Sequence, residues 1–138
     1  MGFTLIEMVI VISIIAMLIG GSALGYSRFQ QNARDTRRKS DLEQIRAAME
    51  LFRSNTINGS YPRAAWFQTD MQPYLNPLPK DPKTGSDYFY DALPNTWPLG
   101  PCDNVTKFCT SYRLYADLEL VAGQNDCMVT PLIPIPQC

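Results

Sequence analysis

The chain has 138 residues, of which 46% are hydrophobic and 18% are charged, and its formal net charge is −1. A dedicated nucleic-acid-binding protein usually carries a basic excess, so this class is disfavoured. There is no histidine, the commonest general base and metal ligand, and this excludes the ordinary nucleophilic triads.

A long uncharged run begins directly after Glu7. No residue from Met8 to Ser27 is charged. About 20 helical residues, at ~1.5 Å each, cross a hydrocarbon layer of ~30 Å. The run is therefore expected to be a membrane-length helix. Glu7 stands at its head, where a carboxylate is expected to lie at the depth of the lipid headgroups or against a partner.

The residues around Glu7 are Gly2-Phe3-Thr4-Leu5-Ile6-Glu7, and they abut the apolar run. This motif resembles the processing site of type IV pilins and of the related type II secretion pseudopilins. The resemblance implies that a prepilin peptidase cuts between Gly2 and Phe3 and that Phe3 then becomes N-methylated. Residues 1–2 would be the remainder of a leader, and residues 3–27 the membrane and filament-core helix.

A pair of opposite charges would follow from that cut. Phe3 would carry a free α-amine, whose reference pKa of about 7.7–8.0 leaves it largely protonated at neutral pH. In a core of stacked helices neither this cation nor the Glu7 carboxylate is tolerable alone, whereas together they satisfy each other. Glu7 of one subunit and the Phe3 amine of its neighbour are therefore expected to set the axial register. The apolar side chains expected in the filament core are Leu5, Ile6, Val9, Ile10, Ile12, Ile15 and Leu18.

One helix is predicted from about Phe3 to Arg53 or Ser54, because all eleven prolines come at or after Pro62. Its second half, residues 28–54, is amphipathic, and this face is expected to dock the C-terminal domain. The apolar positions recur at three- and four-residue steps: Leu42, Ile45, Ala48, Met49 and Phe52. Three glycines in the first half are expected to make the helix flexible, through close packing or through unwinding on assembly: Gly20, Gly21 and Gly25.

A basic cluster follows the apolar run and consists of Arg34, Arg37, Arg38 and Lys39. Three interpretations are open. The cluster contacts lipid headgroups before assembly, pairs with acids of neighbouring subunits, or keeps one helix face solvated. We favour the solvated face.

Residues 55–138 are predicted to form a small head. Period-two alternation gives a clear strand, and two shorter runs are weaker candidates. The strand candidates are Tyr88–Tyr90, Thr110–Leu120 and Cys127–Thr130. A short helix is expected at Ala64–Tyr74 and a turn at Leu78–Gly85, and the prolines of residues 131–138 exclude the tail from a central strand. The fold class is therefore α+β, a long N-terminal helix with a small antiparallel sheet packed on its second half.

Four cysteines lie in the last 37 residues of the chain: Cys102, Cys109, Cys127 and Cys138. An even number confined to the part expected to be exported predicts two disulfides. Three pairings exist, and the most local one, Cys102–Cys109 with Cys127–Cys138, is favoured. A zinc site built from all four thiolates is the rival, but the spacings lack the tight pairs that are usual for structural zinc.

No catalytic set and no metal site is assigned from the sequence, and no cofactor is expected. Isolated loop acids are usually solvated, and those considered as a cation cluster are Asp81, Asp87, Asp91 and Asp103. Calcium is the ion considered for these acids, because major pseudopilins hold calcium in a C-terminal acidic loop. Here the corresponding region offers only Asn125 and Asp126. Two N-glycosylation tripeptides, beginning at Asn58 and Asn104, are interpreted as chance matches.

The resemblance implies a structural subunit and not an enzyme. The subunit would be held in the bacterial inner membrane and would then polymerise with copies of itself into an extracellular type IV pilus. Its further partners would be prepilin peptidase, inner-membrane lipid, the assembly platform and its ATPases, since the chain has no phosphate-binding motif of its own. A major pseudopilin of a type II secretion system and a membrane-tethered binding module that never polymerises are the alternatives. The cysteine-rich end and the missing acidic calcium loop favour the pilus subunit.

Overall fold

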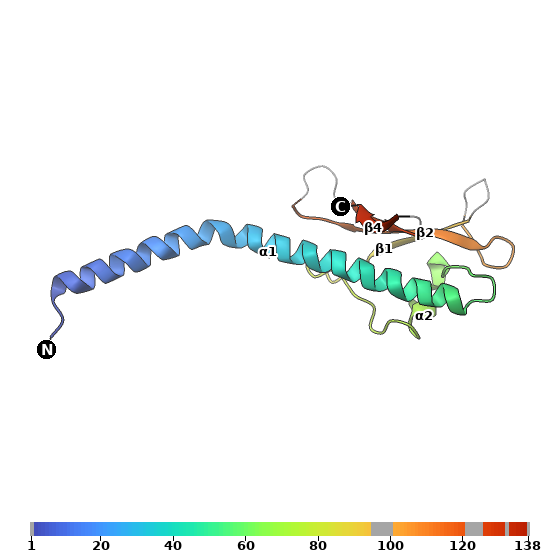
Figure 1. Cartoon of the computed structure of the whole chain (residues 1–138), viewed down its shortest axis with the longest axis horizontal. Helices are drawn as coiled ribbons and strands as arrows, with labels where there is room; N and C mark the ends of the chain where they lie inside the picture. The colour runs from blue at the N-terminus through green and yellow to red at the C-terminus, as the bar shows by residue number, and fades with distance from the viewer. Residues whose placement is uncertain (1, 95–100, 121–125, 132, 138) are drawn as a thin grey trace.

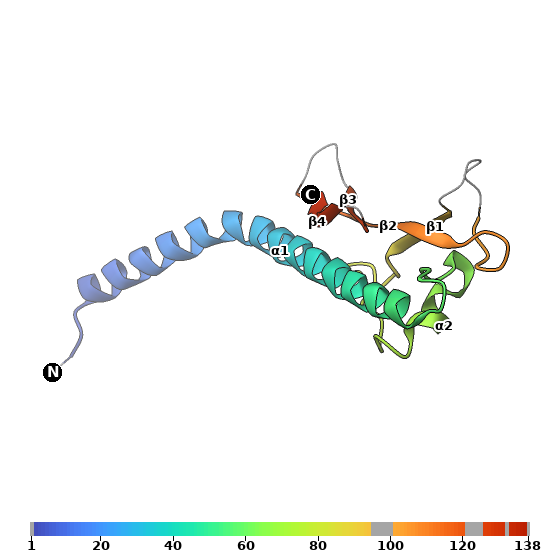
Figure 2. The same ribbon diagram turned by 45° about the vertical axis from the view of Figure 1, so that its right-hand side comes forward.

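The computed structural model describes residues 2–94, 101–120, 126–131 and 133–137. It consists of one long helix, α1 (Leu5–Asn55), and an antiparallel sheet that lies over the second half of that helix (Figure 1). The first half of α1 projects away from the sheet, and the same separation is visible after a turn of 45° (Figure 2). The predicted α+β class is confirmed.

Local contacts fix both ends of α1. Thr4 caps the start, because its Oγ1 accepts a hydrogen bond from the Glu7 N–H at 3.4 Å. At the other end the Thr56 N–H donates to the Arg53 carbonyl, and Gly59 takes a positive φ of 57° as the chain turns into the head. The predicted end of the helix therefore falls one or two residues before the observed end.

Helix α1 is continuous through the three glycines that were expected to loosen it: Gly20, Gly21 and Gly25. At Gly20 an added Cβ would meet no atom within 4 Å, so no contact in the described part of the chain requires glycine there. Unwinding of this stretch on assembly stays a prediction.

The sheet has four antiparallel strands in the order β1-β2-β3-β4: β1 (Phe89–Pro94), β2 (Cys109–Asp117), β3 (Asp126–Thr130) and β4 (Ile133–Gln137). The three predicted strands are present, although β1 runs on to Pro94 and β2 stops at Asp117. The sequence did not predict β4. It lies at the edge of the sheet, where prolines are tolerated, and not in the centre from which they exclude it.

Buried and exposed side chains alternate along β2, and this alternation explains which face of the strand packs on the core. Tyr112, Leu114 and Ala116 are buried in the core, whereas Arg113 and Asp117 are exposed. The first residue of β1 pairs with the seventh residue of β2, so the end of β2 runs past the start of β1. This overhang leaves the end of β2 without a strand partner on its β1 side.

The apolar face of α1 docks under the sheet, as predicted. Leu42, Ile45, Ala48 and Met49 are at most 4% exposed, and Phe52 is partly buried. They belong to one cluster with side chains of the head, among them Tyr61, Met71, Tyr112, Leu114 and Val129. Full burial of an aliphatic side chain stabilises a fold by ~1.5–3 kcal/mol. This face of α1 therefore determines where the head sits.

The connection from α1 to the sheet contains less helix than the predicted helix at Ala64–Tyr74. It contains a 3-10 turn, η1 (Ala64–Trp66), and the short helix α2 (Phe67–Met71). The predicted turn before β1 is present, because the Gly85 N–H donates to the Asp81 carbonyl at 2.9 Å and Gly85 has a φ of 71°.

The disulfide prediction holds as far as the described residues reach. Cys102 and Cys109 form a disulfide. Cys127 is also disulfide-bonded, and its predicted partner, Cys138, lies outside the described residues. The zinc alternative is therefore wrong, because at least three of its four proposed ligands are oxidised.

Candidate functional site

The apolar segment, residues 3–19, is exposed along its whole length. Its large apolar side chains are between 46% and 83% exposed. All the residues expected in a filament core are among them: Leu5, Ile6, Val9, Ile10, Ile12, Ile15 and Leu18. Apolar surface this continuous marks a site of contact with other molecules. Among the residues that the structure describes, no helix combines the length and the apolar character that a membrane span requires.

Glu7 lies in the first turn of α1, where its backbone N–H takes part in the helix cap and its carboxylate does not. Its spacing from Thr4 is that of a capping box, a signal in the sequence that the prediction missed. Only half of the box is formed, because Thr4 accepts from the backbone of Glu7 while the Glu7 carboxylate bonds to no described residue. Phe3, which is 77% exposed, makes no bond to Glu7 within the chain. Their predicted pairing is therefore one between molecules, and it stays a prediction.

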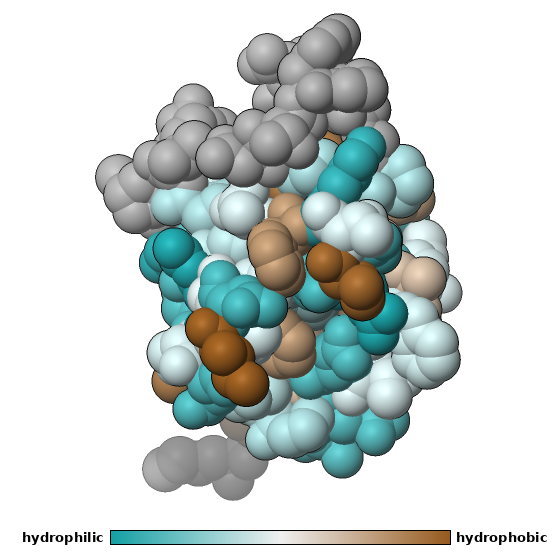
Figure 3. Space-filling model, turned by 90° about the vertical axis from the view of Figure 1, so that its right-hand side faces the viewer, coloured by the Kyte–Doolittle hydropathy of each residue, from teal (hydrophilic) through white to brown (hydrophobic). Residues whose placement is uncertain are grey.

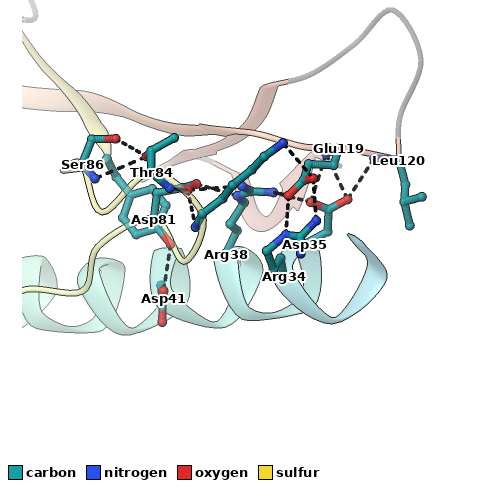
Figure 4. A network of polar contacts seen from close by, with 11 residues as sticks. Arg34, Asp35, Arg38, Asp41, Asp81, Thr84, Ser86, Glu119 and Leu120 are labelled. Carbon is teal, nitrogen blue, oxygen red and sulfur yellow. Dashed lines mark hydrogen bonds and ion pairs between the residues drawn. The ribbon is translucent and has the colours of Figure 1, made fainter. Parts of the chain in front are cut away.

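A second group of polar residues joins α1 to the head. We call it the Arg38 cluster, and it consists of Arg34, Asp35, Arg38, Asp81, Lys83 and Glu119 (Figure 4). Arg38 lies at its centre with a side chain only 3% exposed. Its Nε is 2.6 Å from an Asp81 oxygen, and its Nη1 is 2.6 Å from Asp35 and 3.1 Å from Glu119. One buried guanidinium thus binds three carboxylates.

The remaining contacts of the cluster involve Glu119 and Asp35. Arg34 binds Glu119 through two nitrogens, at 2.7 and 2.8 Å, and the Lys83 Nζ lies 3.1 Å from the same carboxylate. Asp35 accepts the backbone N–H groups of Glu119 and Leu120 at 3.0–3.1 Å. Three cations and three carboxylates are therefore brought together from α1, the turn before β1 and the end of β2. The cluster fastens the head at the middle of α1, next to where the exposed half begins.

This arrangement corrects the interpretation of the basic cluster as a solvated face. Arg37 and Lys39 are exposed, as that interpretation requires. Arg38 is buried and Arg34 is partly buried, so for these two residues it is wrong. The sequence carried a signal, because Arg34 and Arg38 continue the buried stripe of α1 in four-residue steps toward Leu42.

The four acids considered as a cation cluster have separate partners and do not gather. Asp81 binds Arg38, Asp87 lies 3.5 Å from the Lys80 Nζ, and Asp91 pairs with Arg113. Asp103 accepts hydrogen bonds from the backbone N–H groups that follow it, those of residues 105–107.

The two glycosylation tripeptides differ in their surroundings. Asn104 has a positive φ of 56°, its Oδ1 accepts from the Cys109 N–H at 2.7 Å, and its Nδ2 donates to the Tyr61 carbonyl at 2.8 Å. The side chain of Asn104 therefore holds two segments of the head together. Asn58 is exposed at the turn after α1.

The carboxylates of the Arg38 cluster have lowered pKa values. Hydrogen bonds from Arg34, and after it from Lys83 and Arg38, lower the pKa of Glu119 to about 2. The hydrogen bond from Arg38 holds the pKa of Asp81 well below its usual range. Such carboxylates stabilise the fold at a pH above their unfolded pKa values, near 4, and lose that contribution as the pH falls toward their folded values.

The head is therefore expected to become less stable as the pH falls from about 4.5 toward 2, because the unfolded chain takes up protons before the folded chain does. Urea unfolding of the full chain in detergent, measured between pH 6 and pH 2, checks this dependence. Glu119→Gln should flatten it. Asp103→Asn serves as the comparison variant. It also removes a carboxylate with a lowered pKa, but this carboxylate lies outside the cluster and owes its lowered pKa to backbone N–H groups. A stability of the unaltered chain that stays constant down to pH 2.5 would contradict the prediction.

Comparison with known proteins bears on the N-terminal residues. Residues 2–23 match the family model described as the prokaryotic N-terminal methylation motif. No curated protein and no solved structure matches the chain. The matched range includes Gly2, Phe3 and Glu7 together with the apolar segment, and it ends before the head begins. This methylation motif supports a type IV pilin-like or pseudopilin protein.

Proposed function

We propose that the chain is the structural subunit of a type IV pilus. The observation that carries the proposal is the exposed apolar segment, which follows a methylation motif and contains one carboxylate without a partner in the described chain. Continuous apolar surface of this kind is stable in lipid or in a bundle of like helices, and is costly in water. A subunit that moves from the membrane into a filament keeps this surface in lipid or in a helix bundle throughout, and so keeps it out of water.

Assembly would exchange lipid contacts for helix–helix contacts. The head is fastened only to the second half of α1, so the apolar segment is available to a bundle without any rearrangement of the sheet. Before assembly the segment would hold the subunit in the inner membrane. Prepilin peptidase would release the Phe3 amine, and the assembly platform with its ATPases would supply the work of extraction.

The Glu7 carboxylate and the Phe3 amine would set the register of that bundle. Along a helix, four residues correspond to an axial offset of ~6 Å. A subunit whose Phe3 amine meets the Glu7 carboxylate of its neighbour would therefore be displaced by about this distance along the filament.

A major pseudopilin is the second candidate, since the methylation motif is common to both groups. The cysteine-rich head supports the pilus subunit. In the described residues it carries one disulfide, and Cys127 takes part in another. Deletion of the gene separates the two roles, because a pilus subunit is needed for surface filaments and a pseudopilin for protein export.

Mass spectrometry of filaments sheared from the cell surface tests the proposal. We expect the chain to be their main component and to begin with an N-methylated Phe3. Recovery of this chain only from membranes, with no filament containing it, would favour a tethered module. An N-terminus other than Phe3 in the filaments would show that the cut was assigned to the wrong bond.

A further inference from the structure

Arg28 marks the boundary at which α1 leaves its uncharged part. It is the first charged residue after Glu7, and helix α1 runs through both residues without a break. The 21 residues that separate them correspond to ~32 Å along a helix, close to the ~30 Å thickness of a hydrocarbon layer. A helix that places Glu7 in one headgroup layer of a membrane therefore places Arg28 in the other.

The guanidinium of Arg28 is available to an external partner. The residue is exposed, and its side chain forms no hydrogen bond or ion pair with any described residue. Arg34 and Arg38, in contrast, bind carboxylates within the Arg38 cluster. A guanidinium carries five N–H donors in a planar fork that fits the oxygens of a phosphate group. Arg28 therefore presents an unused phosphate-binding group at the level of the lipid headgroups.

Two aromatic side chains accompany Arg28 at this level. Tyr26 is 63% exposed and Phe29 is 70% exposed. Such amphipathic and aromatic side chains are typical of the boundary between lipid and water. At about 100° per residue, Arg28 is turned by about 100° from Phe29 and by about 160° from Tyr26, so the three surround the helix. A single protein partner contacts one face of a helix, whereas lipid contacts it from all sides, and this spread favours lipid.

The head leaves room for a headgroup layer around Arg28. Among the described residues, the first side chains of α1 that bond to the head are those of Arg34 and Asp35, which bind Glu119. They follow Arg28 by about 9–10 Å along the helix. The polar layer on each side of a bilayer is ~5–8 Å thick. The head can therefore sit directly above the headgroups while Arg28 lies among them.

Two other exposed cations of α1 lie too far along the helix to share this contact. Arg37 and Lys39 form no ion pair with any described residue. They lie ~14 and ~17 Å beyond Arg28. Interactions between exposed charges are largely screened beyond ~8–10 Å in physiological salt. Arg37 is therefore an arginine of the same kind that stands outside the headgroup layer.

The far end of the head has a different surface (Figure 3). Hydrophilic side chains predominate in this view, and the most apolar side chains visible there stand apart from one another. Apolar side chains that are exposed singly are ordinary on a protein surface in water. The contact with lipid headgroups is therefore assigned to the boundary on α1 and not to this end of the molecule.

We propose that Arg28 binds the phosphate group of an anionic phospholipid where α1 leaves the membrane, with Tyr26 and Phe29 in the same headgroup layer. An anionic lipid is favoured because its phosphate charge is not balanced by an ammonium group. One basic residue near an anionic surface changes the association by about fivefold. The contact rests on the proposed function, since it belongs to the subunit stored in the membrane and is given up when the subunit enters a filament.

The preference for anionic lipid tests the proposal. The full chain is reconstituted in phosphatidylcholine vesicles with a trace of spin-labelled phosphatidylglycerol or spin-labelled phosphatidylcholine, and electron paramagnetic resonance measures the lipid held by the protein. The unaltered chain should bind phosphatidylglycerol about fivefold more tightly than phosphatidylcholine. Arg28→Gln should lower this preference to less than about twofold. Arg37→Gln is the matched control and should leave the preference nearly unchanged, because Arg37 lies beyond the screening length.

An ionic control distinguishes a lipid headgroup from free phosphate. Sodium phosphate and sodium chloride of equal ionic strength should weaken the preference equally, because both act only by screening. A stronger effect of phosphate would show that Arg28 binds the free ion, and would overturn the proposal.

Solid-state NMR measures the contact directly. With ¹³C in the guanidinium carbon of arginine, the ³¹P nuclei of the lipid should dephase an arginine signal, and Arg28→Lys should abolish this dephasing. Arg37→Lys should leave it unchanged. Absence of dephasing in the unaltered chain would also contradict the proposal.

The outcomes separate the two failures. If the vesicles do not retain the unaltered chain, storage in the membrane, and with it the proposed function, is wrong. If they retain it but Arg28→Gln keeps the full preference, the Arg28 contact alone is wrong. A full preference together with a low filament yield for Arg28→Gln would assign Arg28 to a neighbouring subunit instead. The exposed position of Arg28 predicts an unchanged melting temperature for the variant, and this measurement excludes misfolding as the cause of a lost preference.

Discussion

A Glu7→Ala variant is expected to reach the membrane but to assemble at least 100-fold less filament than the unaltered chain. In the proposed bundle, the substitution would leave the Phe3 amine of each neighbour without its counter-charge in apolar surroundings. Leaving one partner of a buried pair uncompensated costs ~3–5 kcal/mol. At ~1.4 kcal/mol per tenfold change, this corresponds to roughly two to three and a half powers of ten in the association constant. Quantitative immunoblotting of sheared and membrane fractions measures the loss.

Two further variants make this experiment specific. Glu7→Gln keeps the size of the side chain and removes only its charge, so it should fail in the same way. Ser13→Ala is the control inside the same segment, because Ser13 donates only to the Val9 carbonyl within its own helix. Its filament yield should stay within twofold of the original. The Thr4 cap survives in all three, because it needs only the Glu7 N–H. Normal filaments from Glu7→Ala would refute the pairing of Glu7 with Phe3.

Arg38→Met is expected to lower the free energy of unfolding of the head by ~3–5 kcal/mol. Methionine fills much of the space of the arginine stem but leaves Asp35, Asp81 and Glu119 close together with less positive charge among them. Repulsion between these carboxylates and their incomplete solvation then favour the unfolded chain. Urea unfolding in detergent, followed by tyrosine and tryptophan fluorescence, measures the change.

Neighbouring substitutions show whether this loss comes from the buried position. Arg37→Met changes the same residue type at an exposed position and should cost at most about 0.5 kcal/mol. Asp81→Asn, combined with Arg38→Met, removes one of the uncompensated carboxylates and should restore part of the lost stability. A loss below ~1 kcal/mol for Arg38→Met would show that the cluster contributes little to holding the head.

The long helix and the main strand were predictable because their signals are local. Side chains that face the core recur at three- and four-residue steps from Leu42 to Met49 in α1. In β2 they occupy every second position, so both patterns can be read from the sequence. The methylation motif is equally local, since its residues lie within one short segment. Local patterns of this kind need no knowledge of the rest of the fold.

The Arg38 cluster was not predictable in the same way. Arg38 is separated by 43 residues from Asp81 and by 81 residues from Glu119, so no window of sequence contains the three together. Charged residues in a helix are most often exposed, and this general tendency gave the wrong interpretation. The strand β4 escaped prediction for a related reason, because its prolines argue against a strand until its place at the sheet edge is known.

The position of β4 has a consequence for a crowded polymer. Open sheet edges present unpaired backbone groups to which a strand of another molecule can attach. β4 is an outermost strand of the sheet and contains Pro134 and Pro136, which have no N–H to offer. In the proposed filament, heads held at high local concentration would thus be discouraged from pairing edge to edge, and the subunits could pack densely without joining their sheets.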